Sequence, residues 1–195
     1  MLINDNDPLA TLVAWRDEAA RAGEKEPDAM ALATATPAGR PSVRMVLWRG
    51  LRDGELWFFT CYESRKAGEL DRNPYGALCF YYPLLGRQVR IEGPVRRLPD
   101  EDSDAYFARR PVGHQLSAIV SPQSRPITSL DELRRKKEEL RQQMGGAALP
   151  RPKTWGGYAL RADSVELWIQ GEERLHDRLL YTRKGSGWHM QRLAP

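Results

Sequence analysis

The sequence predicts an α+β fold, in which a mostly antiparallel β-barrel or sheet carries helices packed on its outside. Short strand-like runs separated by turn residues, such as Ala29–Thr36, Pro41–Trp48 and Glu55–Cys61, are typical of an antiparallel meander. Helical segments stand before, between and after these runs, as expected for helices packed outside such a sheet. No linker or shift in composition divides the chain, so we expect one domain over residues 1–195.

Each element follows from a local pattern. A helix is expected over Pro8–Ala22, because Asp7 can cap it and Pro8 suits its first turn. Further helices are expected at Ser64–Asn73, Asp100–Arg110 and Leu130–Met144. Further strands are expected at Ala77–Tyr82, Arg87–Glu92, Pro94–Leu98, Trp155–Leu160, Ser164–Ile169, Arg178–Thr182 and Trp188–Arg192.

The bulk properties narrow the class of protein. No apolar run approaches the roughly 20 residues that span a bilayer, and residues 1–7 lack the pattern of a signal peptide, so we expect a cytoplasmic protein without membrane contact. The cysteines, Cys61 and Cys79, are expected to be reduced and buried, and no Cys/His cluster indicates a metal. The net charge of +4 allows nucleic acid as a partner, but no basic-aromatic stripe supports that interpretation.

Three clusters of cations stand out, although the common nucleotide-binding and hydrolase motifs are absent. Arg44 and Arg49 stand near the two ends of one strand, and Arg65 and Lys66 follow Ser64 at an expected helix start. A helix start with two cations suits a phosphate group. The third cluster is Arg174-Leu175-His176-Asp177-Arg178. The structural alternative for each cluster is a solvated strand end or a helix cap; it is weakest for the third.

The C-terminal quarter carries a specific set of motifs in order. These are Trp155-Gly156-Gly157-Tyr158, Glu166-Leu167-Trp168, Arg174-Leu175-His176-Asp177-Arg178 and Arg192-Leu193-Ala194-Pro195. With earlier matches at Ser64-Arg65-Lys66 and Val120-Ser121-Pro122-Gln123-Ser124, the chain resembles the pyridoxamine 5′-phosphate oxidase family from about Asp7 to Pro195. The resemblance implies an FMN-binding split barrel, a homodimer with flavin at the subunit interface, and a dimerisation segment at about 150–195.

The resemblance also implies a flavin site. Its residues are Arg44, Met45, Val46, Leu47, Phe59, Thr60, Arg65, Lys66, Gln88, Gln123, Ser124, Trp168 and Arg178, some of them from the partner subunit. Arg65 and Lys66 are expected to hold the FMN phosphate, as their position at the helix start also indicates. The protein is then expected to position the substrate against the flavin and to polarise the reacting groups, because the flavin carries the redox chemistry.

The implied reaction is oxidation of pyridoxamine or pyridoxine 5′-phosphate by dioxygen to pyridoxal 5′-phosphate and hydrogen peroxide, a step in vitamin B6 metabolism. The implied substrate residues are Arg49, Tyr106, Arg110 and His114 around the phosphate, with Arg174 and His176 as catalytic residues at the pyridine ring. Two phosphorylated ligands require two separate groups of cations, and arginine suits phosphate.

Three positions depart from the family pattern. Arg49 replaces the usual lysine, His114 a small hydroxyl residue, and Trp48 an aliphatic residue that we expect to face the core. One alternative is a flavin oxidase of the same fold acting on a phenazine precursor. Tyr106 and Arg110 favour the vitamer phosphate. A second alternative is a non-catalytic flavin- or pyridoxal phosphate-binding protein, which Arg174 and His176 disfavour.

Overall fold

The computed structural model describes residues 3–4 and 6–195. Met1, Leu2 and Asp5, which belong to the N-terminal stretch considered above, lie outside the described residues. The helices are α1 (Pro8–Ala22), α2 (Arg65–Leu70), α3 (Asp100–Arg109), α4 (Val112–Val120) and α5 (Leu130–Met144), with short 3-10 turns η1 (Pro83–Leu85) and η2 (Glu172–Arg174). The strands are β1 (Ala29–Ala35), β2 (Pro41–Leu47), β3 (Leu51–Arg52), β4 (Glu55–Cys61), β5 (Tyr75–Tyr82), β6 (Arg87–Arg97), β7 (Trp155–Arg161), β8 (Ser164–Ile169), β9 (Asp177–Lys184) and β10 (Gly187–Leu193).

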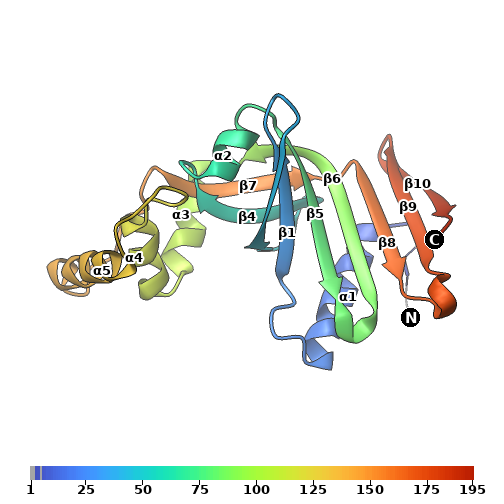
Figure 1. Cartoon of the computed structure of the whole chain (residues 1–195), viewed down its shortest axis with the longest axis horizontal. Coiled ribbons are helices and arrows are strands. Elements are labelled where there is room, and N and C mark those ends of the chain that lie inside the picture. Colours follow the sequence, from blue (N-terminus) through green and yellow to red (C-terminus); the bar gives the residue numbers. More distant parts are fainter. Residues whose placement is uncertain (1–2, 5) are drawn as a thin grey trace.

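The strands form one strongly curled antiparallel sheet, and this confirms the predicted fold class. Its main path runs β10-β9-β8-β6-β5-β1-β2, while β7 pairs with β4 and with the end of β6. Figure 1 shows β4 and β7 crossing behind β1, β5 and β6, so that the sheet closes into a half-barrel. Helix α1 lies under one end of the half-barrel, and α3–α5 lie at the opposite side from β8–β10.

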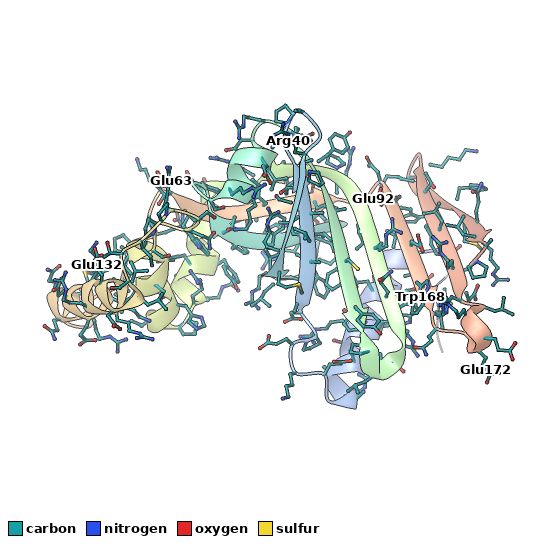
Figure 2. All side chains as sticks on the ribbon, in the orientation of Figure 1. Arg40, Glu63, Glu92, Glu132, Trp168 and Glu172 are labelled. Atoms are coloured by element: carbon teal, nitrogen blue, oxygen red, sulfur yellow. The ribbon has the colours of Figure 1, made fainter. Side chains whose placement is uncertain are left out.

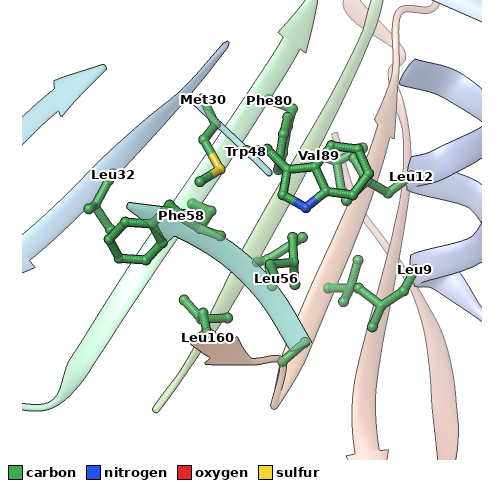
Figure 3. Close-up of a cluster of buried hydrophobic side chains, with 14 of the residues drawn as sticks. Leu9, Leu12, Met30, Leu32, Trp48, Leu56, Phe58, Phe80, Val89 and Leu160 are labelled. Carbon is green, nitrogen blue, oxygen red and sulfur yellow. The ribbon is translucent and has the colours of Figure 1, made fainter. Parts of the chain in front are cut away.

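Helix α1 and the inner face of the sheet enclose the main core. The helix has the predicted bounds, with Asp7 accepting hydrogen bonds from the backbone of Leu9 and Ala10, and it ends at Gly23 in the left-handed conformation. Apolar side chains from α1 and from β1, β4, β5, β6 and β7 meet in this core (Figure 3). Trp48 faces it, as predicted, and packs edge-on against Phe80 with ring centroids 5.9 Å apart.

Strand β6 differs from the prediction, which divided it into two strands at Gly93 and Pro94. The structure shows one strand that changes partner at this point, pairing with β8 up to Glu92 and with β7 from Val95 onward. A side chain at Gly93 would meet the backbone oxygen of Arg161 at 2.0 Å, so the close approach of β7 requires glycine. The Gly-Pro pair therefore marks a bend in a continuous strand rather than a break.

Helix α4 has no counterpart in the prediction. Pro111 ends α3 and also precedes α4, and the side chain of Gln115 donates to the backbone oxygens of Ala108 and Arg110, joining the two helices. Helix α5 packs against α4 and has no buried residue. None of the described helices is long and apolar enough to cross a membrane.

Candidate active site

A cavity of about 900 Å³ opens between the edge strand β2, the end of β4, helix α2 and the α3–α4 arm. Its volume suits a cofactor together with a small ligand. All the predicted site residues from Arg44 to Ser124, except Gln88, line this cavity. They are Arg44, Met45, Val46, Leu47, Arg49, Phe59, Thr60, Arg65, Lys66, Tyr106, Arg110, His114, Gln123 and Ser124.

In the structure the cations group differently from the clusters seen in the sequence. Arg44, Arg65 and Lys66 lie together where β2 meets α2, and we define them from here on as the first cation cluster. Helix α2 is shorter than predicted and starts at Arg65, with the Ser64 hydroxyl accepting from the backbone of Ala67. Arg44 projects from the edge strand, and its guanidinium donates to the Leu32 carbonyl at 3.1 Å and to the Thr34 hydroxyl at 2.6 Å. These contacts give the cluster a fixed position beside the cavity.

Lys66 is the buried member of this cluster. Its ammonium donates to Thr60 Oγ1 at 3.0 Å and to Gln123 Oε1 at 2.9 Å. Within the described part of the chain it has neither an ion-pair partner nor a carboxylate hydrogen bond. Burial lowers its pKa to about 8, and the charge of Arg44 adds to this shift. An anion would stabilise a buried ammonium that has no counterion, so this part of the cavity is suited to one.

The second cation cluster, which we define as Arg49, Arg110 and His114, lines the same cavity beside α3 and α4. The Arg110 guanidinium lies 4.6 Å from the centre of the Trp155 ring, and its buried Nη1 has no hydrogen-bond partner among the described residues. Burial lowers the pKa of Arg110 from its ordinary value. A guanidinium that rests on an aromatic face keeps its hydrogen-bond donors available for an anion.

An aromatic stack lies on the same wall of the cavity as the second cation cluster. The Phe59 and Tyr106 rings lie parallel with centroids 3.9 Å apart, and Phe59 also stacks on Trp155 at 5.5 Å. This stack packs closely on β7, since a side chain at Gly157 would meet Phe59 Cε1 at 2.7 Å. The motif that begins at Trp155 thus reflects packing against the cavity wall.

The remaining predicted residues form a separate group on β6, β8, β9 and the turn between β8 and β9, away from the cavity. They are Gln88, Trp168, Arg174, His176 and Arg178. Gln88, Trp168 and Arg178 are register partners across β6, β8 and β9, so they form one row. His176 contacts Trp168 with ring centroids 4.6 Å apart, and Arg174 lies on η2. Figure 2 places Trp168 and Glu172 at the opposite end of the molecule from the α4–α5 arm, where Glu132 lies. One chain therefore carries two groups of predicted residues that do not meet.

The turn from Gly171 to His176 orients the second of these groups. The Gly171 backbone N–H donates to His176 Nδ1 at 3.2 Å, so a neutral ring carries its proton on Nε2 and can donate from that atom. Arg174 has a left-handed backbone with φ of 67°. Such a conformation is unfavourable for a residue other than glycine and often occurs at functional sites.

Sequence reasoning missed several residues of this cavity. Trp155 belongs to a quoted motif but was given no role, although it supports Arg110. Ser42 and Arg109 also line the cavity, and buried Glu69 contacts Arg44 and Arg65. For Glu69 a signal existed, because it stands four residues after Arg65 on the same helix, where side chains meet.

Two protein-family models match this chain. Residues 17–144 match the family model described as pyridoxamine 5′-phosphate oxidase. The chain belongs to this family. Residues 155–195 match a second model, the pyridoxine 5′-phosphate oxidase C-terminal dimerisation region. The family resemblance predicted from the motifs is therefore confirmed, and both groups of site residues lie within the matched ranges or directly beside them.

Relatives within the pyridoxamine 5′-phosphate oxidase family match nearly the whole chain. A protein named pyridoxine/pyridoxamine 5′-phosphate oxidase from Rubrobacter xylanophilus is 51% identical, and the match covers 98% of this chain and 88% of that protein. A protein of the same name from Salinibacter ruber is 48% identical over 97% of this chain and 90% of its own length.

Solved structures agree with the family's split-barrel fold. The structure of PhzG from Burkholderia lata 383, in complex with tetrahydrophenazine-1-carboxylic acid, has a TM-score of 0.91 and 34% identity, covering 97% of this chain and 93% of that chain. A pyridoxamine 5′-phosphate oxidase-related, FMN binding protein from Nostoc punctiforme, 19% identical, has a TM-score of 0.77 and covers both chains completely. At that identity the second similarity concerns the fold alone.

Proposed function

We propose that this protein uses FMN and dioxygen to oxidise pyridoxine 5′-phosphate to pyridoxal 5′-phosphate and hydrogen peroxide. With pyridoxamine 5′-phosphate, water is also consumed and the amino group leaves as ammonia. The observation that carries the proposal is a single cavity lined by two cation clusters, each with a buried or half-buried cation that lacks a counterion among the described residues. Two phosphorylated ligands, a cofactor and a substrate, need such an arrangement. The names of the relatives support the same reaction.

The residues of the first cation cluster fit the phosphate of FMN. Arg44, Arg65 and Lys66 would hold the phosphate, and Lys66 in particular offers a buried ammonium that lacks an anion. FMN held there would supply the two-electron redox chemistry between the substrate and dioxygen. The rest of the cofactor would lie along Met45, Val46, Leu47, Phe59, Thr60, Gln123 and Ser124, which line the same cavity.

The second cation cluster fits the substrate phosphate. Arg110 would bind it through the donors that are unpartnered in this structure, with Arg49, His114 and Tyr106 beside it. His114 can donate a hydrogen bond to phosphate, and Arg49 keeps the charge of the lysine usual in the family. Positioning of this kind contributes strongly to rate, because the reacting groups must be held in a narrow geometry.

The separation of the two groups of residues supports a homodimer. In our proposal Gln88, Trp168, Arg174, His176 and Arg178 complete the cavity of the partner subunit, and the partner's copies complete this one. The match of residues 155–195 to a dimerisation region supports this arrangement. We further propose that residues 1–195 form one domain that includes this region; the cytoplasmic location stays a prediction.

Oxygen-dependent turnover of pyridoxamine 5′-phosphate by the FMN-loaded protein tests the proposal. We expect formation of an aldehyde product that absorbs as pyridoxal 5′-phosphate, with one peroxide released per product. A protein that binds FMN tightly and turns over neither pyridoxamine nor pyridoxine 5′-phosphate would contradict the proposed substrate and retain the flavin site.

A second candidate is oxidation of a reduced phenazine carboxylic acid, which the similarity to PhzG favours. The same assay, with a tetrahydrophenazine carboxylic acid in place of the vitamer, distinguishes the two. Arg110 and Arg49 in one cavity favour the phosphorylated substrate, because a phosphate dianion gains more than a carboxylate from two neighbouring guanidinium groups.

The affinity for FMN is expected to fall as pH rises above about 8. Lys66 has a lowered pKa of about 8, so it is charged below this pH and loses its proton above it, while the phosphate remains a dianion. The dissociation constant should rise by up to about tenfold per pH unit above 8. Titration by flavin fluorescence from pH 7 to 9.5 measures this. The Lys66→Arg variant, charged throughout, should show a flat profile; a flat profile in the unaltered protein would contradict the role of Lys66.

Replacing Gly171 by alanine is expected to lower turnover about tenfold to 100-fold, with FMN still bound. The added Cβ would lie 1.9 Å from the Leu175 carbonyl oxygen, so the turn that carries Arg174 and His176 must shift. Steady-state kinetics and flavin content measure the two effects. Gly187→Ala is the matched control, because nothing lies within 4 Å of a side chain at that position. Equal activity of both variants would show that the turn does not position the reacting groups.

A further inference from the structure

Glu69 is a buried carboxylate at the centre of the first cation cluster, and the proposed reaction gives it no role. Its side chain is 3% exposed. It contacts Arg65 Nε at 2.9 Å along α2 and Arg44 Nη2 at 3.4 Å across to β2. No other described carboxylate pairs with either guanidinium. The carboxylate thus links the two arginines that approach the cavity from different elements.

Two hydroxyl groups complete this link. The hydroxyls of Thr34 and Ser42 both donate to Glu69 Oε2, and both accept from the Arg44 guanidinium, Thr34 from Nη1 and Ser42 from Nη2. These directions are forced, because a guanidinium only donates and a carboxylate only accepts. The guanidinium plane of Arg44 is therefore held at two of its nitrogens by groups that Glu69 orients.

The charges of the cluster are matched to a phosphate monoester. Arg44, Arg65 and Lys66 carry three positive charges and Glu69 one negative charge, which leaves an excess of two. A phosphate monoester carries about −1.5 to −2 at neutral pH. Hydrogen bonds from Ser42 and Thr34, together with Arg65, outweigh burial and lower the pKa of Glu69 to about 2, so the carboxylate stays ionised wherever the protein is folded and active.

We propose that Glu69 is the positioning residue of the phosphate-binding cluster, and that it makes the site selective for the phosphorylated flavin over the unphosphorylated one. This inference rests on the proposed binding of FMN at this cluster. Glu69 does not touch the phosphate in the proposal; it acts through Arg44 and Arg65, which it fixes with their free donors toward the cavity. A glutamine here cannot accept from both arginines and both hydroxyls, since one of its terminal atoms is a donor.

The test compares the affinities for FMN and for riboflavin, which lacks the phosphate, in the full-length protein freed of flavin. The unaltered protein is expected to prefer FMN. Glu69→Gln should weaken FMN binding by about tenfold or more and leave riboflavin binding unchanged, because charge-assisted hydrogen bonds act on the phosphate alone. Glu63→Gln is the matched control: it removes the same charge just before α2, but Glu63 is exposed, and its FMN affinity should be unchanged.

The outcomes separate the two proposals. Absence of a preference for FMN in the unaltered protein would overturn the proposed binding of the FMN phosphate at the first cation cluster. An unchanged FMN affinity in Glu69→Gln, with the preference intact, would overturn the role of Glu69. A stronger FMN affinity would also overturn it and would show that the Glu69 charge repels the phosphate. Equal weakening for both flavins would also overturn it, since it would indicate a general loss of structure. Ser42→Ala, at a half-buried edge position, provides a second variant, and a smaller loss specific to FMN is expected.

Discussion

Replacing Arg174 by alanine is expected to lower turnover of pyridoxamine 5′-phosphate about 100-fold or more while FMN remains bound. Arg174 is exposed at the end of η2 with a left-handed backbone, and it forms no ion pair with the described residues. An exposed guanidinium without an ion-pair partner among the described residues is free to contact a ligand or a second subunit. In the proposed dimer it holds the substrate ring in the partner's cavity, so its loss affects the rate and not the cofactor.

Two further variants sharpen this result. Arg174→Lys keeps the charge but loses the planar group and should recover only part of the rate. Lys184→Ala removes an exposed cation from the far end of β9, and its turnover should match that of the unaltered protein. Flavin content is measured in each variant by visible absorbance. Loss of flavin in Arg174→Ala would contradict its assignment to the substrate.

The combined replacement Arg65→Ala and Lys66→Ala is expected to release FMN from the purified protein. Each side chain would contribute a charge-assisted hydrogen bond to the phosphate, on the order of 1.5–3 kcal/mol. Together they predict a dissociation constant raised by about 100-fold to 10,000-fold. Flavin content after gel filtration, followed by titration with FMN, measures the loss. Because Lys66 is buried, the thermal transition of the flavin-free forms must be compared as well.

Matched variants separate charge from packing. Lys66→Met fills the buried space without a charge, and should lose affinity for FMN as Lys66→Ala does. Arg72 lies just after α2 and is exposed, and its side chain donates to the Gly68 carbonyl within that helix. The Arg72→Ala variant should retain FMN. An undiminished flavin content in the double variant would show that the phosphate binds elsewhere.

Local patterns were enough to predict most of the fold. Helix α1 has its predicted bounds because a side-chain cap, a proline and a left-handed glycine define its ends within the segment itself. Strand β6 was divided wrongly, because a glycine and a proline in sequence look alike whether a strand ends or only bends. Helix α4 was missed because it begins directly after Pro111 and contains Gly113, and its support comes from contacts with α3.

The site was predicted less evenly. The cations were recognised because charged residues at strand and helix ends are visible in the sequence, and the family motifs named the rest. The roles of Glu69 and Trp155 could not be predicted, because each one depends on contact with an arginine from another part of the chain. Arg44 reaches Glu69 from another element, and Trp155 follows Arg110 by 45 residues, so these pairs exist only after folding. The division of the residues into two groups also depends on strand order, which the sequence does not display.

That division has a genetic consequence. In the proposed dimer each cavity takes the first cation cluster from one chain and Arg174 from the other. A chain lacking Arg65 and Lys66 and a chain lacking Arg174 are each inactive alone, but a mixed pair contains one cavity with both lesions and one with neither. Two defective alleles expressed in one cell should therefore restore about a quarter of normal activity by random pairing.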